Sequence, residues 1–401
     1  MTNKIVVVGS GIAGLSALKA IREVDRDSEI TFLGEEKFFP YYRIKLSKYL
    51  FDELSEDKFL IQKKEWYGQN NINICLGNKV KRIDVEKREV ILSDENVLFY
   101  DKLLLANGAS NFKPPIHGMD LPGVFSLRAL QDAMDIREQI EGDEQVIIIG
   151  GGIQGLETAW SLHKTGARVS IVELLPRIMP NQLDERASEL LKQSIEKFEI
   201  AMLPNTRIER LSGNSQVEGI VTAAGEILPC KKVIYSVGIR PNVEIVQGTS
   251  IRHGKGILVN EKMETSVDHI YAAGDIAEFN NRIAGSWNLS LAQGKVAGYN
   301  IAGKDSVYQE ILPAVTLNAF DLTLFSMGRV NDAEACHLAE ESKEGHYTQI
   351  SIKDDRIIGA IVIGDTKRSL LLKSAMEKGV SVKPLNYYEA TVGELLSFLQ
   401  N

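Results

Sequence analysis

The stretch IVVVGSGIAG at Ile5–Gly14 joins a β-branched run to a glycine-rich turn. The run predicts a strand that is buried on both faces of a parallel sheet, and residues 15–24 then carry apolar side chains at helical spacing. Between a strand and a helix, Gly9 permits the tight bend, Gly11 lets a pyrophosphate approach the backbone, and Gly14 lets helix and strand pack closely. The stretch therefore predicts a dinucleotide-binding unit.

The same arrangement occurs a second time in the chain. The sequence QVIIIGGGIQG at Gln145–Gly155 is followed by a predicted helix at 156–164 and a predicted strand at 168–172. Each copy has an acid near the end of its second strand, Glu35 in the first and Glu173 in the second, where a carboxylate can accept hydrogen bonds from a ribose diol. Two copies in one chain predict two bound dinucleotides.

Glu173 also bears on which pyridine nucleotide binds. A carboxylate at this position bonds a free ribose 2′-hydroxyl and repels a 2′-phosphate, so NADH should be preferred over NADPH. A hydrogen bond to a charged group contributes roughly 1.5–3 kcal/mol, or about one to two decades in affinity. The nearby Arg177 leaves room for NADPH, and a surface glutamate that only caps its strand is the alternative interpretation.

The composition excludes several classes of protein. The 401 residues are 44% hydrophobic and 25% charged, which is typical of a globular chain of two or three domains. The formal charge of −8 opposes an overall nucleic-acid surface, and the apolar runs are far shorter than a membrane span. The first residues lack the features of a signal peptide and the 3 cysteines form no CxxC pair, so we expect a cytoplasmic protein without a disulfide scaffold.

Four more stretches match one known family. They are PYYRIKLSK at 40–48, DKLLLANGA at 101–109, VIYSVGIRPN at 233–242 and TSVDHIYAAGD at 265–275. With these motifs and the two glycine-rich turns, the chain resembles the flavoprotein pyridine-nucleotide oxidoreductases that carry two dinucleotide-binding domains, over nearly its whole length. One departure is Asn107, which stands where the family usually has threonine.

The resemblance implies an α/β protein with two Rossmann-like domains of the glutathione-reductase type and a small C-terminal α/β domain. The motif order predicts an FAD-binding domain at 1–112 and 243–308, an NADH-binding domain inserted at 113–242, and the C-terminal domain at 309–401. In that last domain we predict strands at 314–318 and 322–327, a hairpin of 347–353 and 356–363, and helices at 369–377 and 392–399.

The resemblance also implies FAD and NADH as cofactors and assigns residues to them. Lys48 should lie beside the flavin, where Glu157 keeps it charged and placed, so these two are the predicted catalytic residues; two unrelated surface charges are the alternative. Glu35 should meet the adenosine ribose, Val80 the adenine through its backbone, and Trp287 the isoalloxazine. The full predicted cofactor-binding set is Gly9, Gly11, Ala13, Gly14, Glu35, Arg43, Lys48, Val80, Asn107, Gly108, Arg128, Gly150, Gly152, Gly155, Glu157, Glu173, Gly238, Gly274, Asp275 and Trp287.

Family members that pass electrons through a protein thiol carry cysteine in the segment that is 39–48 here. This chain has none there, its nearest being Cys75, so electrons should leave for an external acceptor. The resemblance favours a small iron–sulfur carrier, rubredoxin first and ferredoxin as runner-up. Arg43, Lys45 and Lys48 are the predicted basic docking patch for it.

Other functions remain open from the sequence. Within the enzyme class they are an NADH:ferredoxin-type reductase, the electron-input subunit of a nitrite reductase, and an NADH oxidase. A different class is a non-catalytic FAD/NADH redox sensor. We expect no metal site, since Cys336 and His337 are adjacent without further ligands, and we expect a monomer or a homodimer.

Overall fold

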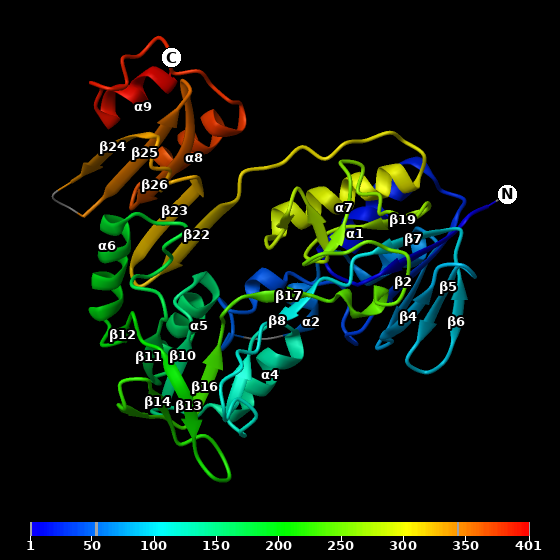
Figure 1. Cartoon of the computed structure of the whole chain (residues 1–401), viewed down its shortest axis with the longest axis horizontal. Coiled ribbons are helices and arrows are strands. Elements are labelled where there is room, and N and C mark those ends of the chain that lie inside the picture. Colours follow the sequence, from blue (N-terminus) through cyan, green and yellow to red (C-terminus); the bar gives the residue numbers. More distant parts are fainter. Residues whose placement is uncertain (1, 53–54, 343–344, 401) are drawn as a thin grey trace.

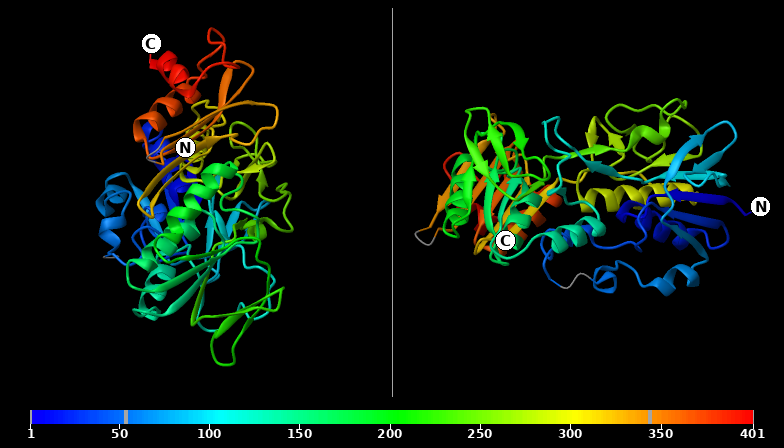
Figure 2. Two further views of the ribbon diagram at one scale, coloured as in Figure 1. Left: turned by 90° about the vertical axis from the view of Figure 1, so that its left-hand side faces the viewer. Right: turned by 90° about the horizontal axis from the view of Figure 1, so that it is seen from below.

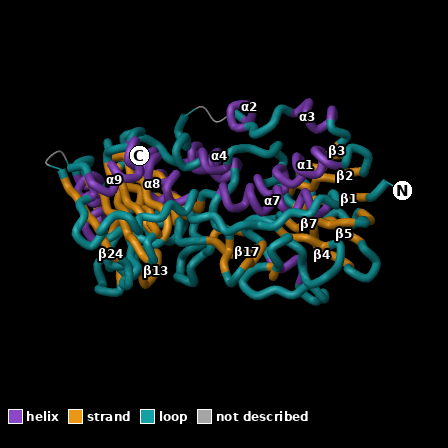
Figure 3. The backbone as a smooth tube through the Cα atoms, turned by 90° about the horizontal axis from the view of Figure 1, so that it is seen from above, coloured by secondary structure: helices purple, strands orange, loops and turns teal. Residues whose placement is uncertain are grey.

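The computed structural model describes residues 2–52, 55–342 and 345–400. Three five-stranded sheets organise these residues. The first sheet lies at one end of the long axis and the third at the other (Figure 1, Figure 3). Within the described ranges, no helix is both long and apolar enough to cross a bilayer.

The first sheet is parallel, with the strand order β19-β7-β1-β2-β3. Its strands are β1 (Lys4–Val8), β2 (Glu29–Gly34), β3 (Ile72–Leu76), β7 (Lys102–Leu105) and β19 (Ile270–Ala272). Ile5 and Val7 pack on one face against α1 (Ile12–Val24) and α7 (Trp287–Ile301). Val6 and Val8 pack on the other face against a meander of β4 (Val80–Asp84), β5 (Glu89–Leu92) and β6 (Val97–Phe99). Burial on both faces explains why β1 is β-branched throughout its apolar run.

Shorter elements lie around the first sheet. They are the 3-10 turns η1 (Arg43–Lys45) and η2 (Val243–Val246), the helices α2 (Glu56–Phe59) and α3 (Lys64–Gln69), and a small sheet of β18 (Ile257–Leu258), β20 (Ala277–Phe279) and β21 (Arg282–Ile283). The turn η1 follows Tyr41 and Tyr42 and leads into the segment that carries Lys48.

The second sheet is also parallel, with the order β12-β11-β10-β16-β9. Its strands are β9 (Val124–Ser126), β10 (Gln145–Ile149), β11 (Arg168–Val172), β12 (Ala201–Leu203) and β16 (Lys232–Tyr235). Its helices are α4 (Leu130–Gln139), α5 (Ile153–His163) and α6 (Glu185–Glu196), and a meander of β13 (Ile208–Ser212), β14 (Gly219–Thr222) and β15 (Ile227–Pro229) follows. The chain reaches and leaves this sheet through β8 (Ala109–Asn111) and β17 (Ile239–Pro241), which pair antiparallel.

The third sheet is antiparallel, with the order β22-β23-β26-β25-β24. The strands predicted in this region are present as β22 (Ala314–Ala319), β23 (Leu322–Gly328), β25 (Tyr347–Lys353) and β26 (Arg356–Ile363). Asp354 and Asp355 join β25 to β26 with φ of 52° and 59°, as a two-residue hairpin turn of the primed type requires. The hairpin prediction is therefore confirmed.

Two features of this region differ from the prediction. The strand β24 (Cys336–Glu341) was not predicted, because its polar sequence shows no clear alternation and only its pairing with β25 makes it an edge strand. The helix α8 (Thr366–Glu377) begins before the predicted residue 369, because the Asp365 side chain accepts hydrogen bonds from the backbone N–H groups of Lys367 and Arg368. The last helix, α9 (Val392–Gln400), agrees with its prediction.

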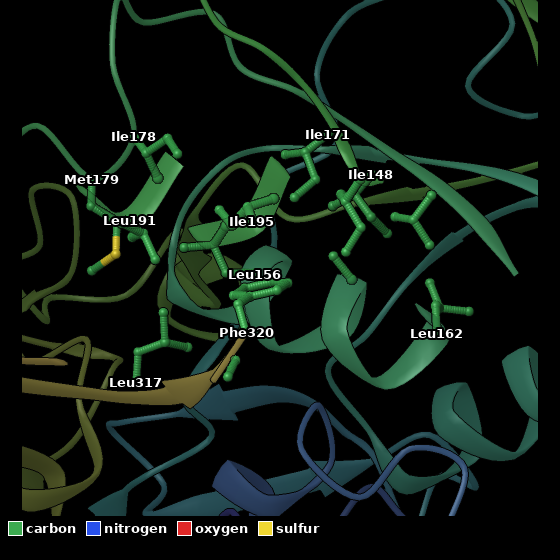
Figure 4. Close-up of a cluster of buried hydrophobic side chains, with 14 of the residues drawn as sticks. Ile148, Leu156, Leu162, Ile171, Ile178, Met179, Leu191, Ile195, Leu317 and Phe320 are labelled. Atoms are coloured by element: carbon green, nitrogen blue, oxygen red, sulfur yellow. The ribbon is translucent and has the colours of Figure 1, made fainter. Parts of the chain in front are cut away.

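One face of the third sheet packs on helices of the second sheet. Leu317 and Phe320 share a buried core with Leu191 and Ile195 of α6 (Figure 4). Ser194 Oγ donates to the backbone carbonyl of Phe320 at 2.6 Å. The view from below in Figure 2 shows the second and third sheets side by side, away from the first. The third sheet is therefore anchored to the second sheet through α6.

Candidate functional site

The first glycine-rich turn forms a cradle at the start of α1. Gly9 has φ of +111°, and a Cβ there would lie 2.1 Å from the carbonyl oxygen of Ala106. A Cβ on Gly14 would lie 2.2 Å from the carbonyl oxygen of Gly9, so helix and strand pack with no room for a side chain. Gly11 differs, because a Cβ there would meet no atom within 4 Å. This open space at a helix N-terminus is what a pyrophosphate requires.

The second glycine-rich turn repeats this geometry at the start of α5. Gly150 has φ of +112°, and its Cβ would lie 2.2 Å from the carbonyl oxygen of Ser236. A Cβ on Gly155 would lie 2.1 Å from the carbonyl oxygen of Gly150, whereas one on Gly152 would meet nothing within 4 Å. Each parallel sheet therefore carries one open anion cradle, at the carboxyl end of β1 in the first sheet and of β10 in the second.

The two acids expected at the ribose positions lie differently. Glu173 is held against the second turn, because its carboxylate accepts from the N–H groups of Gly151 at 2.6 Å and Leu175 at 2.8 Å. Glu35 forms an exposed ion pair with Lys79 at 2.9 Å. Arg177 donates to the carbonyls of Pro180 and Leu183, so its guanidinium is occupied by its own loop.

A network of charged side chains joins the first cradle to the start of α4. Arg128 Nη2 lies 2.7 Å from Asp275 Oδ2, and Ser290 Oγ donates to Asp275 Oδ1 at 3.3 Å. Arg43 donates to the carbonyl of Arg128 and forms a 2.6 Å ion pair with Glu36. Three predicted site residues, Arg43, Arg128 and Asp275, thus come together from separate parts of the chain.

Glu36, at the centre of this network, was missed by sequence reasoning. Its other carboxylate oxygen accepts from the Tyr41 hydroxyl at 2.7 Å. Burial raises the pKa of Tyr41, so this hydroxyl keeps its proton and donates. The sequence does show a second acid directly after Glu35, but the motif assigns a role only to Glu35. Arg43, one of the three residues of the expected docking patch, is engaged with Glu36 and with the Arg128 carbonyl.

Asn107 and Asn242 form two reciprocal hydrogen bonds beside the paired strands β8 and β17. Asn107 Nδ2 donates to the Asn242 carbonyl at 2.9 Å, and Asn242 Nδ2 donates to the Asn107 carbonyl at 3.0 Å. Asn107 Oδ1 is buried and has no hydrogen-bond partner among the described residues. Such an orphaned acceptor fits a bound group that donates a hydrogen bond. Gly108 and Gly238, on either side of this asparagine pair, have φ of +66° and +104°.

Close approach of α1 and α7 explains the glycines after β19. A Cβ on Gly274 would lie 2.9 Å from Ala13 Cβ, and one on Gly294 would lie 2.1 Å from the Ala13 carbonyl oxygen. The N–H group of Gly274 donates to Gln293 Oε1 at 2.9 Å. The first turn of α1 and the segment before Asp275 are therefore in contact at the cradle.

Two further predicted residues, Trp287 and Val80, begin elements that pack on the first sheet. Trp287, the first residue of α7, stacks on Tyr42 with ring centroids 5.5 Å apart. Lys45 Nζ also lies 4.6 Å from the centroid of the Tyr42 ring. Val80 begins β4 and is buried in the meander core.

Glu157, on α5, contacts the segment that carries Lys48. Glu157 Oε2 accepts a hydrogen bond from Ser47 Oγ at 2.6 Å. Burial raises the pKa of Glu157, while the Ser47 hydrogen bond and the charge of Lys48 oppose the rise. Among the described residues, no ion pair within 4.0 Å joins Lys48 to Glu157. The charge of Lys48 still influences the pKa of Glu157, so the two groups interact without direct contact.

The cysteines form no disulfide. All three are free: Cys75 and Cys336 are partly exposed, and burial raises the pKa of Cys230 to about 12. His337 contacts Ser351 and Gln349. In the part of the chain that the structure describes, no group of three or more His, Cys, Asp or Glu could hold a metal ion.

Two parallel sheets, each with an open anion cradle at a helix N-terminus, are the arrangement of a protein that binds two dinucleotides. Residues 3–296 match the family model described as pyridine nucleotide-disulphide oxidoreductase. Residues 313–380 match a second model, the rubredoxin NAD+ reductase C-terminal domain. The chain belongs to the pyridine nucleotide-disulphide oxidoreductase family.

Individual relatives agree with this assignment. NADH-rubredoxin oxidoreductase of Clostridium acetobutylicum is 32% identical over 394 residues, which are 98% of this chain and 100% of that one. A nitrite reductase of Bacillus subtilis is 31% identical over 94% of this chain, which spans 48% of that protein. The crystal structure of NADH:rubredoxin oxidoreductase from C. acetobutylicum has a TM-score of 0.81 at 31% identity, covering 99% of this chain and 100% of that one. Putidaredoxin reductase, in a covalent complex, shares the fold with a TM-score of 0.91 at 23% identity over 99% and 98% of the two chains.

Proposed function

We propose that this chain transfers electrons from NADH, through bound FAD, to rubredoxin. FAD and NADH are the cofactors of the family, and relatives of similar length are named for NADH and rubredoxin. The observation that carries the proposal is the match of residues 313–380 to the C-terminal domain of rubredoxin NAD+ reductases. This match narrows a broad family to an iron–sulfur carrier as the acceptor.

The two cradles divide the cofactors between the first two sheets. The open space at Gly11 and the orphaned Asn107 Oδ1 fit FAD at the first sheet. The open space at Gly152 fits the pyrophosphate of NADH at the second. FAD, when bound, takes up an electron pair as hydride and releases the electrons singly, which suits an iron–sulfur acceptor. The other predicted cofactor contacts, among them Glu35, Val80 and Trp287, and the domain boundaries stay proposals.

Lys48 and Glu157 are proposed to work on the flavin side of the boundary between the sheets. Ser47 holds the Glu157 carboxyl by a hydrogen bond, and the charge of Lys48 acts on that carboxyl, so the two groups interact electrostatically. Lys48 is proposed to supply positive charge where electrons arrive at the flavin. Its placement then depends on the backbone segment of Ser47 and Lys48.

The geometry of the second cradle supports NADH over NADPH. Glu173 is fixed by two backbone N–H groups at the position where a 2′-phosphate would bring negative charge. Arg177, which the sequence left as a possible partner for that phosphate, is turned to the carbonyls of Pro180 and Leu183. We expect NADPH to bind at least about tenfold more weakly, as one charged hydrogen bond is lost.

A basic and apolar surface near Trp287 is the proposed docking site for the carrier. Lys45 covers the Tyr42 ring that stacks on Trp287, and the neighbouring Ile44 is 56% exposed. Lys48 continues the positive charge, whereas Arg43 is neutralised by Glu36. Charge of one sign on a small surface speeds the encounter with an acidic partner and makes it sensitive to salt.

One experiment tests the proposed function. The purified flavoprotein is reduced anaerobically with NADH or NADPH, and rubredoxin, ferredoxin, nitrite reductase, oxygen and a quinone are offered in turn. Fast, salt-sensitive reoxidation by rubredoxin is expected. Faster turnover with any other acceptor, or sluggish turnover with all of them, would reject rubredoxin as the acceptor. Light scattering on the same sample decides between the proposed monomer and homodimer.

A further inference from the structure

One buried hydroxyl on α5 reaches across to the segment that carries Lys48. Ser161 is 2% exposed, and its Oγ donates to the backbone carbonyls of Ser47 at 2.8 Å and of Lys48 at 3.0 Å. One hydrogen is thus shared between two consecutive carbonyls from the other side of the boundary between the first two sheets. The contact links α5, a helix of the second sheet, to the backbone of Lys48.

Ser161 and Glu157 act on the same two residues from one face of α5. They are four positions apart, so their side chains lie one above the other on the helix. Glu157 holds the Ser47 side chain, and Ser161 holds the Ser47 and Lys48 main chain. The dipeptide is therefore gripped at both its side chain and its backbone.

The surroundings of Lys48 make this grip important. A cavity of about 180 Å³ is lined by Lys48, Phe51, Asp52, Ser161, Lys164 and Thr165. A lysine beside such a space is not fixed by close packing, and no ion pair within 4.0 Å holds it to Glu157 among the described residues. Its Nζ lies 5.7 Å from the centroid of the Tyr49 ring, and the hydrogen bonds from Ser161 fix the backbone from which this side chain extends.

We propose that Ser161 is a positioning residue that holds Lys48 at the flavin. The inference rests on the proposed role of Lys48. Because Gly152 is the N-cap of α5, the helix proposed to meet the NADH pyrophosphate is the same helix that positions the lysine. Ser161 thus ties the placement of Lys48 to the nucleotide-binding end of the second sheet.

The test compares Ser161→Ala with a control variant that loses a buried serine hydroxyl on another helix. Ser188→Ala removes an equally buried hydroxyl on α6 that donates to the Ile178 carbonyl at 2.8 Å instead of to the segment that carries Lys48. We expect Ser161→Ala to slow flavin reduction by NADH about three- to tenfold, as for one lost positioning hydrogen bond, and Ser188→Ala to leave it unchanged. The midpoint potential of the bound flavin should shift negative only in Ser161→Ala. Ser161→Thr, which keeps the hydroxyl, should restore both.

A double variant separates positioning from a merely structural role. In a Lys48→Met background, Ser161→Ala should cause no further slowing, because the group that it positions is gone. Equal rates and potentials for wild type and Ser161→Ala would overturn the inference, and so would additive slowing. An unchanged rate in Lys48→Met alone would instead reject the proposed role of Lys48, and the inference with it. If Ser161→Ala does not fold, Ser161→Cys keeps the volume with a weaker donor and should show the same changes.

Discussion

Arg128 Nη2 lies 2.7 Å from Asp275 Oδ2 and so joins the start of α4 to the segment that follows β19. Both residues were expected at FAD, and the structure brings them together at the first cradle. Arg43 supports the pair by donating to the Arg128 carbonyl. The pair therefore couples the flavin side of the first sheet to the first helix of the second.

Removal of this pair should weaken FAD binding. Arg128→Ala and Asp275→Asn should each raise the FAD dissociation constant about ten- to a hundredfold, since a charged hydrogen bond contributes roughly 1.5–3 kcal/mol. Flavin content after dialysis and titration of the apoprotein measure the effect. Arg282→Ala breaks an exposed pair with Glu310 and is the control. Full flavin retention by Arg128→Ala would show that the pair serves only the fold.

In the second glycine-rich turn, Gly152 is expected to affect NADH binding, whereas Gly155 is expected to affect packing of the fold. Gly152→Ala should leave the melting temperature unchanged but raise the NADH dissociation constant about tenfold or more, because its methyl group enters the space meant for the pyrophosphate. Gly155→Ala should destabilise the fold by about 1–3 kcal/mol, because its Cβ would lie 2.1 Å from the Gly150 carbonyl oxygen. Thermal unfolding and nucleotide titration of both variants check this contrast. Equal effects of the two changes on binding would refute it.

Glu157 should make stability depend on pH. Burial raises its pKa above the ordinary value of 4.5, so the folded state binds the proton more tightly than the unfolded state. Its contribution is therefore greatest below that value and declines as pH rises through the folded pKa. Glu157→Gln should remove this decline in a melting-temperature series against pH.

Glu394 is the contrast for this measurement. Hydrogen bonds from Thr391 lower its pKa, so its contribution is present at higher pH and is lost as pH falls through its folded pKa. Glu394→Gln should consequently reduce the fall of the melting temperature at acid pH and leave the rest of the pH series unchanged. If Glu157→Gln changed the fall at acid pH instead, burial would not be the dominant influence on Glu157.

Phe320 should anchor the third sheet. It is fully buried, and its ring centroid lies 5.2 Å from that of Trp160 on α5. Phe320→Ala should cost about 3–5 kcal/mol and loosen the third sheet from α5 and α6. Limited proteolysis within 302–313 should then become faster. Phe99→Ala, at an exposed site on β6, should leave both stability and cleavage unchanged.

Local sequence was sufficient for the two cradles and for most strands around them. The spacing of Gly9, Gly11 and Gly14 predicts the turn from residues that are adjacent in the chain, although the close approach at Gly9 involves the distant carbonyl oxygen of Ala106. The hairpin of β25 and β26 was equally readable, because its turn residues and flanking apolar runs are adjacent in the chain. The edge strand β24 could not be predicted from its own sequence, because its conformation depends on pairing with β25.

The contacts that join the parts required the three-dimensional arrangement. Ser47, rather than Lys48, meets Glu157, Ser161 grips both carbonyls, and Glu36 neutralises Arg43. Each of these pairs depends on how whole sheets and helices are placed, which no local pattern encodes. Motifs and their spacing thus identify the cofactors, because phosphate recognition is a local property of the backbone. Which side chains hold Lys48 in place is decided by packing between segments that are far apart in sequence.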